Sequence, residues 1–228
     1  MVEKKGRAVM MVMVDIDADM DGDFNAWYDQ EHVPDLLAMP GFLNAGRYQA
    51  VKGGPRYLAC YELESTDALQ TPEYLNMRNN PSDWTKRISL STNGRSYVRN
   101  VYTQIYPDTN DENVLGRGMA PALQVGRMDV PMDIEDKYNE YYDTVRTPSN
   151  LTVPGCIAVR RYSAIEGGPK YLTIYEFEHE KVPETLAWEE RRSMDRMHEF
   201  IGGHYGHAHG SPGAVSYTHL TLPTNREV

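Results

Sequence analysis

The chain has 228 residues, of which 40% are hydrophobic and 25% are charged, and these fractions are ordinary for a folded globular protein. Its 33 acidic residues outnumber 23 basic ones, so the formal net charge is −10 at pH 7. A chain of this charge repels phosphate backbones and anionic lipid, and we therefore expect neither a nucleic-acid partner nor a membrane partner.

The two cysteines, Cys60 and Cys156, each lie in an apolar run. They cannot form a disulfide framework or a four-ligand zinc site, which fits a reducing compartment, and we expect a cytoplasmic protein. The apolar run from Ala8 to Val14 is followed at once by Asp15, so we interpret it as a strand and not as a signal peptide. No stretch reaches the roughly 18 apolar residues that a membrane span needs.

In the first half of the chain, the hydrophobic pattern alternates between the strand period and the helix period. The elements expected in chain order are a strand over 8–17, a helix over 21–38, strands over 42–51 and 56–64, a helical stretch broken by Pro72 and Pro81, and a strand over 97–106. Gly53-Gly54-Pro55 supplies the tight turn between the two middle strands. This βαββαβ order predicts a four-stranded antiparallel sheet with both helices on one face.

The same unit occurs twice, at a constant offset of 114 residues. From residue 24 to residue 64, 18 of 41 positions are identical to the residue 114 positions later. We therefore predict a first half over 1–107, a linker over 108–120 and a second half over 121–214. Each half leaves one sheet face bare, so we expect the two sheets to cover each other within one α+β barrel.

The C-terminal residues 215–228 look foreign to the protein. The segment Val215-Ser-Tyr-Thr-His-Leu-Thr-Leu-Pro-Thr224 resembles the translation of a transposon-end adapter used in sequencing libraries. We therefore leave residues 215–228 out of the fold prediction and expect the second half to lack its last strand. That loss would leave an unpaired sheet edge, which favours aggregation.

Several motifs resemble EthD-type proteins of the dimeric α/β-barrel superfamily. They are the segment Phe24-Asn-Ala-Trp27-Tyr28-Asp29-Gln-Glu31-His32-Val33-Pro34, the turn Pro40-Gly41, the pair Arg47-Tyr48, and Gly53-Gly54-Pro55 leading into Tyr61-Glu62. The resemblance covers most of residues 8–200 and implies two ferredoxin-like halves, with antiparallel four-stranded sheets, that pack as an intrachain dimeric α/β barrel. The superfamily includes cofactor-independent monooxygenases, lactone isomerases, polyketide cyclases and heme enzymes, so the fold does not fix the function.

The two copies differ most at the end of their first helix, where Glu31-His32-Val33 is replaced by Val145-Arg146-Thr147. Pro34 lacks an N–H and disfavours a helical conformation of Val33, so within the predicted helix we expect a backbone carbonyl to be left free next to His32, as at a helix C-terminus. A helix C-terminus and a nearby carboxylate would raise the pKa of this imidazole, so its charge would change near neutral pH. The alternative is that His32 only caps the helix end.

The candidate catalytic residues are His32 as acid or base, with Glu31 or Asp29 orienting it; the candidate substrate-binding residues are Trp27, Tyr28, Arg47, Tyr48 and Tyr61. Tyr48, Tyr57 and Tyr61 in the predicted strands are candidates to line a barrel lumen around an aromatic ligand, although tyrosines in strands more often simply pack.

Arg47 and Arg161 lie in apolar strands, where a buried charge needs a partner. Glu62 and Glu176 on the neighbouring strands are the expected partners, and we prefer a structural ion pair to a bond with a substrate carboxylate.

A histidine-rich segment near the C-terminus contains the residue type that binds zinc, copper or nickel. It comprises His204, His207 and His209, with His198 upstream. Three glycines between residues 203 and 210 indicate a flexible loop, so we predict no metal site. Phosphate-loop, dinucleotide, nucleophile-elbow and zinc-protease motifs do not occur, and no cofactor is predicted.

We expect an EthD-like enzyme that acts on a small hydrophobic or aromatic oxygenated metabolite by His32-assisted acid/base chemistry, of the cofactor-independent oxygenase, isomerase or cyclase type. One alternative is a non-catalytic barrel that binds a small molecule for a degradative oxygenase pathway, and another is a structural protein whose lumen is filled. The expected partner is a small-molecule ligand, and a homodimer is left open.

Overall fold

The computed structural model describes residues 3–200 and 215–219, in which eight strands form a closed antiparallel barrel. The strands are β1 (Ala8–Asp15), β2 (Phe42–Lys52), β3 (Tyr57–Leu63), β4 (Arg95–Tyr106), β5 (Ala122–Met128), β6 (Cys156–Glu166), β7 (Tyr171–Phe177) and β8 (Val215–His219). They are joined around the barrel in the order β1-β3-β2-β8-β5-β7-β6-β4.

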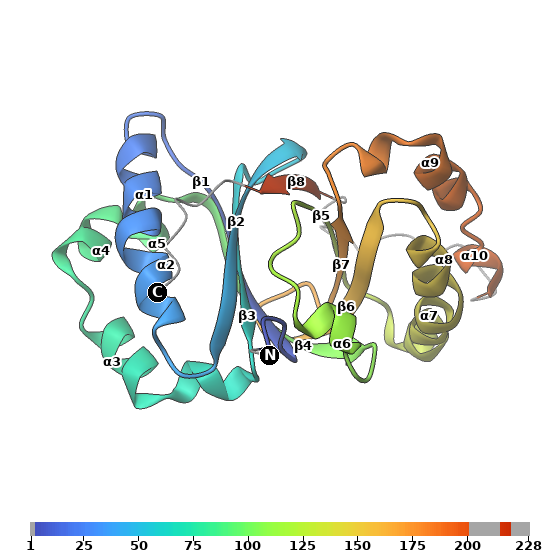
Figure 1. Cartoon of the computed structure of the whole chain (residues 1–228), viewed down its shortest axis with the longest axis horizontal. Helices are drawn as coiled ribbons and strands as arrows, with labels where there is room; N and C mark the ends of the chain where they lie inside the picture. The colour runs from blue at the N-terminus through green and yellow to red at the C-terminus, as the bar shows by residue number, and fades with distance from the viewer. Residues whose placement is uncertain (1–2, 201–214, 220–228) are drawn as a thin grey trace.

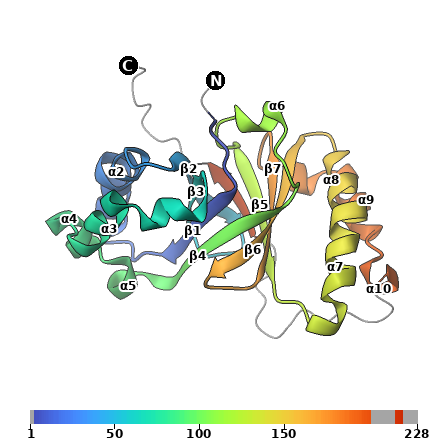
Figure 2. The same ribbon diagram turned by 90° about the horizontal axis from the view of Figure 1, so that it is seen from below.

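The helices lie outside the barrel, with those of the first half on one side and those of the second half on the other (Figures 1 and 2). In the first half they are α1 (Asp21–Trp27), η1 (Tyr28–His32), α2 (Val33–Leu37), η2 (Thr66–Gln70), α3 (Pro72–Asn79), α4 (Asp83–Ile88) and α5 (Leu90–Asn93). They continue with α6 (Glu112–Leu115), η3 (Met132–Ile134), α7 (Glu135–Tyr141), η4 (Tyr142–Arg146), α8 (Thr147–Leu151), η5 (Val182–Glu184), α9 (Leu186–Ser193) and α10 (Met197–Phe200).

The predicted α+β class and antiparallel barrel are confirmed, and the four strands expected in the first half occur close to their predicted bounds. Elements of the two halves recur at the 114-residue offset, as η1 at Tyr28–His32 and η4 at Tyr142–Arg146 illustrate. Gly53 and Gly167 take φ angles of +84° and +78° in the turns after β2 and β6, a conformation that favours glycine. None of the described helices is long and apolar enough to cross a membrane.

The expectation that the second half lacks its last strand is wrong for this structure. Val215–His219 form β8, which pairs with β2 on one side and β5 on the other and so closes the barrel. The Tyr217 hydroxyl donates a hydrogen bond to the Pro55 carbonyl at 3.3 Å, as Tyr102 in β4 does to Pro169 at 3.3 Å. Val215, Tyr217 and Thr218 are residue types that favour strands, whatever the source of the segment. The adapter origin of residues 215–228 stays a prediction.

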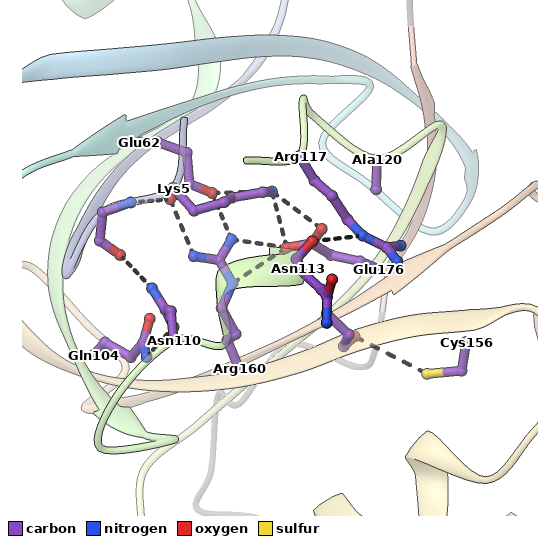
Figure 3. A network of polar contacts seen from close by, with 12 residues as sticks. Lys5, Glu62, Gln104, Asn110, Asn113, Arg117, Ala120, Cys156, Arg160 and Glu176 are labelled. Carbon is purple, nitrogen blue, oxygen red and sulfur yellow. Dashed lines mark hydrogen bonds and ion pairs between the residues drawn. The ribbon is translucent and has the colours of Figure 1, made fainter. Parts of the chain in front are cut away.

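The barrel interior contains a buried cluster of two cations and two carboxylates, which we call the interior ion cluster (Figure 3). It consists of Lys5, Glu62, Arg160 and Glu176, whose side chains are at most 2% exposed. Arg160 donates to Glu62 at 2.5 and 3.0 Å and to Glu176 at 2.7 and 3.2 Å. Lys5 lies 3.0 Å from Glu176 and 3.3 Å from Glu62, so each carboxylate contacts both cations.

The predicted pairs of Arg47 with Glu62 and of Arg161 with Glu176 are therefore wrong. Successive side chains of a strand point to opposite faces of the sheet. On β3, Glu62 points into the barrel, as Cys60 does, whereas Arg47 on β2 points to the helix-covered face.

Candidate functional site

A cavity of about 640 Å³ lies in the first half, between the outer face of the sheet and the helices that cover it. Strands β1 and β4 form its floor, and η1, α2, α3, α4 and α5 contribute its walls. Its lining includes Met10, Val12, Trp27, Tyr28, Glu31, His32, Asp35, Leu36, Tyr74, Met77, Arg78, Ser82, Thr85, Lys86, Tyr97 and Arg99. A volume of this size is typical of small-molecule pockets.

His32 lies on the wall of this cavity, at the end of a single π-helical turn. The helix continues beyond it, because the Val33 N–H bonds to the Tyr28 carbonyl five residues earlier and α2 then runs to Leu37. A π turn adds a residue at this point, which lets the helix pass Pro34 without ending. The helical segment therefore ends at Leu37, next to the predicted end at residue 38, but the expectation that Pro34 gives His32 the environment of a helix C-terminus is wrong.

The imidazole of His32 is surrounded by aromatic rings. It stacks on the Trp27 indole with ring centroids 4.2 Å apart and planes inclined by 21°. It also meets the edges of Tyr28 and Tyr61, at centroid distances of 5.3 and 6.4 Å. Among the described residues, no hydrogen bond or ion pair engages the ring, so its nitrogens are available to a ligand.

Burial lowers the pKa of His32 to about 4, below its usual 6.5. The negative charge of Glu31 acts in the opposite direction, and Arg47 lowers the value further. The expected upward shift is wrong, because desolvation by the aromatic wall outweighs the nearby carboxylate and no helix C-terminus contributes. His32 is therefore neutral at pH 7.

We expect the ring protons of His32 to titrate near pH 4 in an NMR pH titration. Because the folded-state pKa is depressed, the stability linked to this residue is complete above pH 6.5 and is lost as the pH falls toward 4. The variant His32→Gln identifies the signals and should remove this part of the pH dependence. A midpoint near 6.5 would mean that water solvates the ring, contrary to the packing described.

Glu31 does not orient His32. Its Oε1 accepts hydrogen bonds from Trp27 Nε1 at 3.2 Å, Ser82 Oγ at 2.5 Å and Thr85 Oγ1 at 3.0 Å. These bonds tie η1 to the start of α4 and fix the Trp27 indole on which the imidazole stacks. Glu31 therefore shapes the cavity wall and acts on His32 through Trp27 and through its charge, without a direct hydrogen bond to the imidazole.

Asp29 does not orient His32 either, because it pairs with Arg47 at 2.7 Å. Arg47 also donates to Asn25 Oδ1 at 2.6 Å, and its guanidinium lies 4.4 Å from the Tyr28 ring centre. In the second half, Arg161 repeats this arrangement by pairing with Asp143. The preference for a structural ion pair at Arg47 agrees with this geometry, although the partner differs from the expected one.

The predicted binding residues divide between two places. Trp27 and Tyr28 line the cavity, and Tyr61 lies directly behind His32. Tyr48 is in the barrel interior, where its hydroxyl donates to the Ala120 carbonyl at 3.1 Å. The tyrosines therefore do not share one lumen, and the cavity lies outside the barrel.

Among the described residues, side chains occupy the region of the second half that corresponds to the wall of the cavity at His32. Arg146 occupies the position of His32 and pairs with Asp195, which also accepts a hydrogen bond from Tyr141 at 2.8 Å. The space left beside these residues is about 40 Å³. The described residues thus form a large cavity in one half and a closed equivalent in the other.

The sequence matches the model of a known protein family. The model of a domain of unknown function, DUF4286, matches residues 7–202. The chain belongs to the DUF4286 family. No curated protein matches the sequence.

The DUF4286 chain is similar in fold to several solved structures. An anthrone oxidase-like protein superposes with a TM-score of 0.60 at 12% identity, covering 96% of this chain and 94% of that chain. A mutant chlorite dismutase from Candidatus Nitrospira defluvii gives 0.60 at 9% identity, covering 96% and 93%. A heme-binding protein from Thermus thermophilus gives 0.51 at 12% identity, covering 96% and 92%. At these identities the similarity shows the dimeric α/β-barrel fold.

The sequence analysis missed much of the cavity of this DUF4286 protein. Tyr97 and Arg99 on β4, and Tyr74 on α3, line it beside the predicted residues. The available signal was the two-residue period of the strand predicted over 97–106, which places Arg99 and Val101 on the helix side and Val98 and Tyr102 in the barrel.

His204, His207 and His209, and the side chain of His198, lie outside the described residues. Across residues 3–200 and 215–219, no group of three or more His, Cys, Asp or Glu side chains is arranged to hold a metal ion.

Proposed function

We propose that the cavity binds a small, planar, oxygenated molecule and that neutral His32 accepts a proton from it. The observation that carries this proposal is the unengaged, neutral imidazole on the wall of a cavity of about 640 Å³. Proton removal next to a carbonyl or hydroxyl group is a step common to isomerase, cyclase and cofactor-independent oxygenase chemistry. We therefore assign the step and leave these reaction classes open.

The surroundings of His32 suit this step in two ways. Trp27 and Tyr28 provide flat apolar surfaces against which an aromatic ligand can stack. A neutral imidazole is ready to accept a proton at pH 7, and an anion formed beside it would raise its pKa in the low-dielectric cavity. Glu31 supports the resulting imidazolium through its negative charge.

We also infer that the chain arose by tandem duplication of a ferredoxin-like, EthD-type unit. The 114-residue offset of sequence and elements supports this history. Arg146 takes the place of His32 in the second half. The first half then carries the proton transfer and the second half serves as scaffold, which agrees with the difference between their cavities.

The test is hydrogen–deuterium exchange into an anthrone, a planar ketone with an acidic methylene group, followed by NMR in deuterated water. Wild-type protein is expected to accelerate the exchange, and His32→Ala to reduce that acceleration about 10²- to 10⁴-fold, the usual contribution of a general base. This readout needs no oxidant and isolates the proton transfer from later steps.

Arg146→Ala is the matched control, because it changes the equivalent position in the filled half. It is expected to leave the exchange rate near that of the wild type. Equal rates for His32→Ala and the wild type would overturn the proposal, as would no acceleration by the wild type.

A binding protein without catalysis is the second candidate. The pKa of about 4 favours it, because a base works best when its pKa lies near the working pH. This candidate predicts saturable binding of the anthrone without exchange, and a shift of affinity but no change of chemistry in His32→Ala.

The cavity does not fit a heme well. A histidine that ligates a metal almost always donates its other ring N–H to a carboxylate, a carbonyl or water. Among the described residues, His32 has no such protein partner, because Glu31 and Asp29 bond elsewhere. The proton transfer proposed for His32 therefore involves no heme.

A further inference from the structure

Although the protein as a whole is acidic, the wall of the cavity contains cationic side chains. Its lining includes three cations, Arg78, Lys86 and Arg99, against the two carboxylates Glu31 and Asp35, while His32 is neutral and the whole chain has a charge of −10. Lys86 and Arg99 each have a carboxylate partner, Asp83 and Glu166, so the value of a cation to a ligand depends on how it is held and how far solvent reaches it.

Arg99 differs from the other two cations in how firmly it is built into the site. Lys86 is 61% exposed and pairs with Asp83, and Arg78 is exposed, whereas the side chain of Arg99 is only 17% exposed. It projects from β4 on the cavity floor. A charge held there is less screened by solvent than one on the rim.

Two neighbours hold the Arg99 guanidinium in place. It donates to the Tyr74 hydroxyl at 3.1 Å and pairs with Glu166 on β6, which belongs to the second half of the chain. The Tyr74 hydroxyl contacts the Met10 sulfur at 4.0 Å. These bonds use two of the five N–H donors of a guanidinium, so donors remain for a ligand.

We propose that the ligand of this cavity is a planar carboxylate, whose anionic group binds Arg99 while its flat body extends toward Trp27 and His32. This inference rests on the proposed function for the site and adds the chemical class of its ligand. A guanidinium recognises a carboxylate better than it does a neutral oxygen, because the two planar groups form paired charge-assisted hydrogen bonds. Tyr74 and Glu166 are positioning residues that keep the guanidinium turned toward the cavity.

The test compares two probes of nearly equal shape, 2-naphthoate and its neutral counterpart 2-naphthamide. Their affinities are measured by NMR titration of the Trp27 indole N–H, with the indole of Trp188 in the second half as an internal reference. Wild-type protein is expected to bind the carboxylate at least about tenfold more tightly than the amide. The variant Arg99→Gln should remove most of this preference and leave amide binding unchanged.

Arg95→Gln is the matched control, since Arg95 is also on β4 but pairs with Asp17 outside the cavity. It should keep the preference for the carboxylate. In wild-type protein, added salt should weaken naphthoate binding and leave naphthamide binding unchanged, which tests the charge even where Arg99→Gln fails to fold.

Equal affinities of the wild type for the two probes, or no binding of naphthoate up to its solubility limit, would overturn the carboxylate assignment. An equal loss in Arg95→Gln and Arg99→Gln would overturn it as well. These outcomes concern binding alone, so they are distinguishable from failure of the His32-dependent exchange, which concerns proton transfer.

Discussion

Replacing Arg160 with methionine is expected to destabilise the fold by about 3–5 kcal/mol, the usual cost of breaking a buried ion pair by removing one partner. In the interior ion cluster, Arg160 contacts both Glu62 and Glu176. Without it, Lys5 alone would face two carboxylates that are 0% and 2% exposed. Water cannot reach these groups to compensate, so the variant leaves a net negative charge in the barrel.

Urea unfolding followed by circular dichroism measures this loss. Arg95→Met is the control, because the exposed pair of Arg95 with Asp17 is expected to contribute no more than about 1 kcal/mol. The double variant with Glu62→Leu and Arg160→Met removes one charge of each sign. It should be less destabilised than the sum of the single variants. Additive losses would contradict the cluster as a balanced unit.

The cluster also predicts how stability depends on pH. Burial by itself would raise the pKa of Glu62, but Arg160 and Lys5 outweigh it and lower the pKa to about 2 from 4.5. Because the folded value is depressed, this stabilisation is complete above pH 4.5 and is lost as the pH falls toward 2. The Arg160→Met variant should therefore lose this component, and its acid unfolding should begin at higher pH.

A chain that ends at Gly213 is expected to aggregate, because removal of β8 opens the barrel between β2 and β5. Both strands then present unpaired backbone N–H and C=O groups, which template pairing with other chains. The loss also uncovers the interior packing of Tyr217, which is fully buried. Light scattering and the melting temperature of the purified protein measure the two effects.

The control for this truncation is a chain that ends after His219, which keeps β8 and should behave as the full chain does. Tyr217→Ala tests the packing separately, with an expected loss of about 3–5 kcal/mol, typical of a large buried aromatic side chain. If the chain ending at Gly213 were as soluble and as stable as the control, β8 would not be needed to close the barrel.

The architecture could be predicted because its signals are local or repeated. The alternation of apolar residues located β1 to β4, and the 114-residue offset indicated a second set of elements. The turn at Gly53 needs a positive φ angle, and a glycine in the sequence indicates such a position.

Contacts across the sheet could not be predicted in the same way, because they depend on register. Arg47 is opposite Ala59, and Glu62 is opposite Asn44 on the other face. A shift of one residue exchanges the two faces of a strand, so the sequence alone could not separate Glu62 from Asp29 as the partner of Arg47.

The predicted upward shift of the His32 pKa was wrong for a related reason. The direction of the pKa shift depends on burial beneath Trp27 and on a helix that continues through Pro34. Neither feature can be recognised from residues 28–34 alone. Ser82 and Thr85 in the cavity wall come 51 and 54 residues after Glu31, which they contact, and no periodic pattern marks them in the sequence. Positions that bind ligands in this way are recognised only once the chain has folded.

Arg146 and Asp195 occupy the position that corresponds to the cavity at His32, so the described residues leave about 640 Å³ in the first half and about 40 Å³ beside Arg146. Saturation should therefore occur at one equivalent per chain, along a plain hyperbola. In a dimer of two identical short subunits, every substitution would change both cavities. When both halves belong to one polypeptide, their sequences can change independently. Selection can then optimise the cavity of the first half, while the second half only has to remain folded.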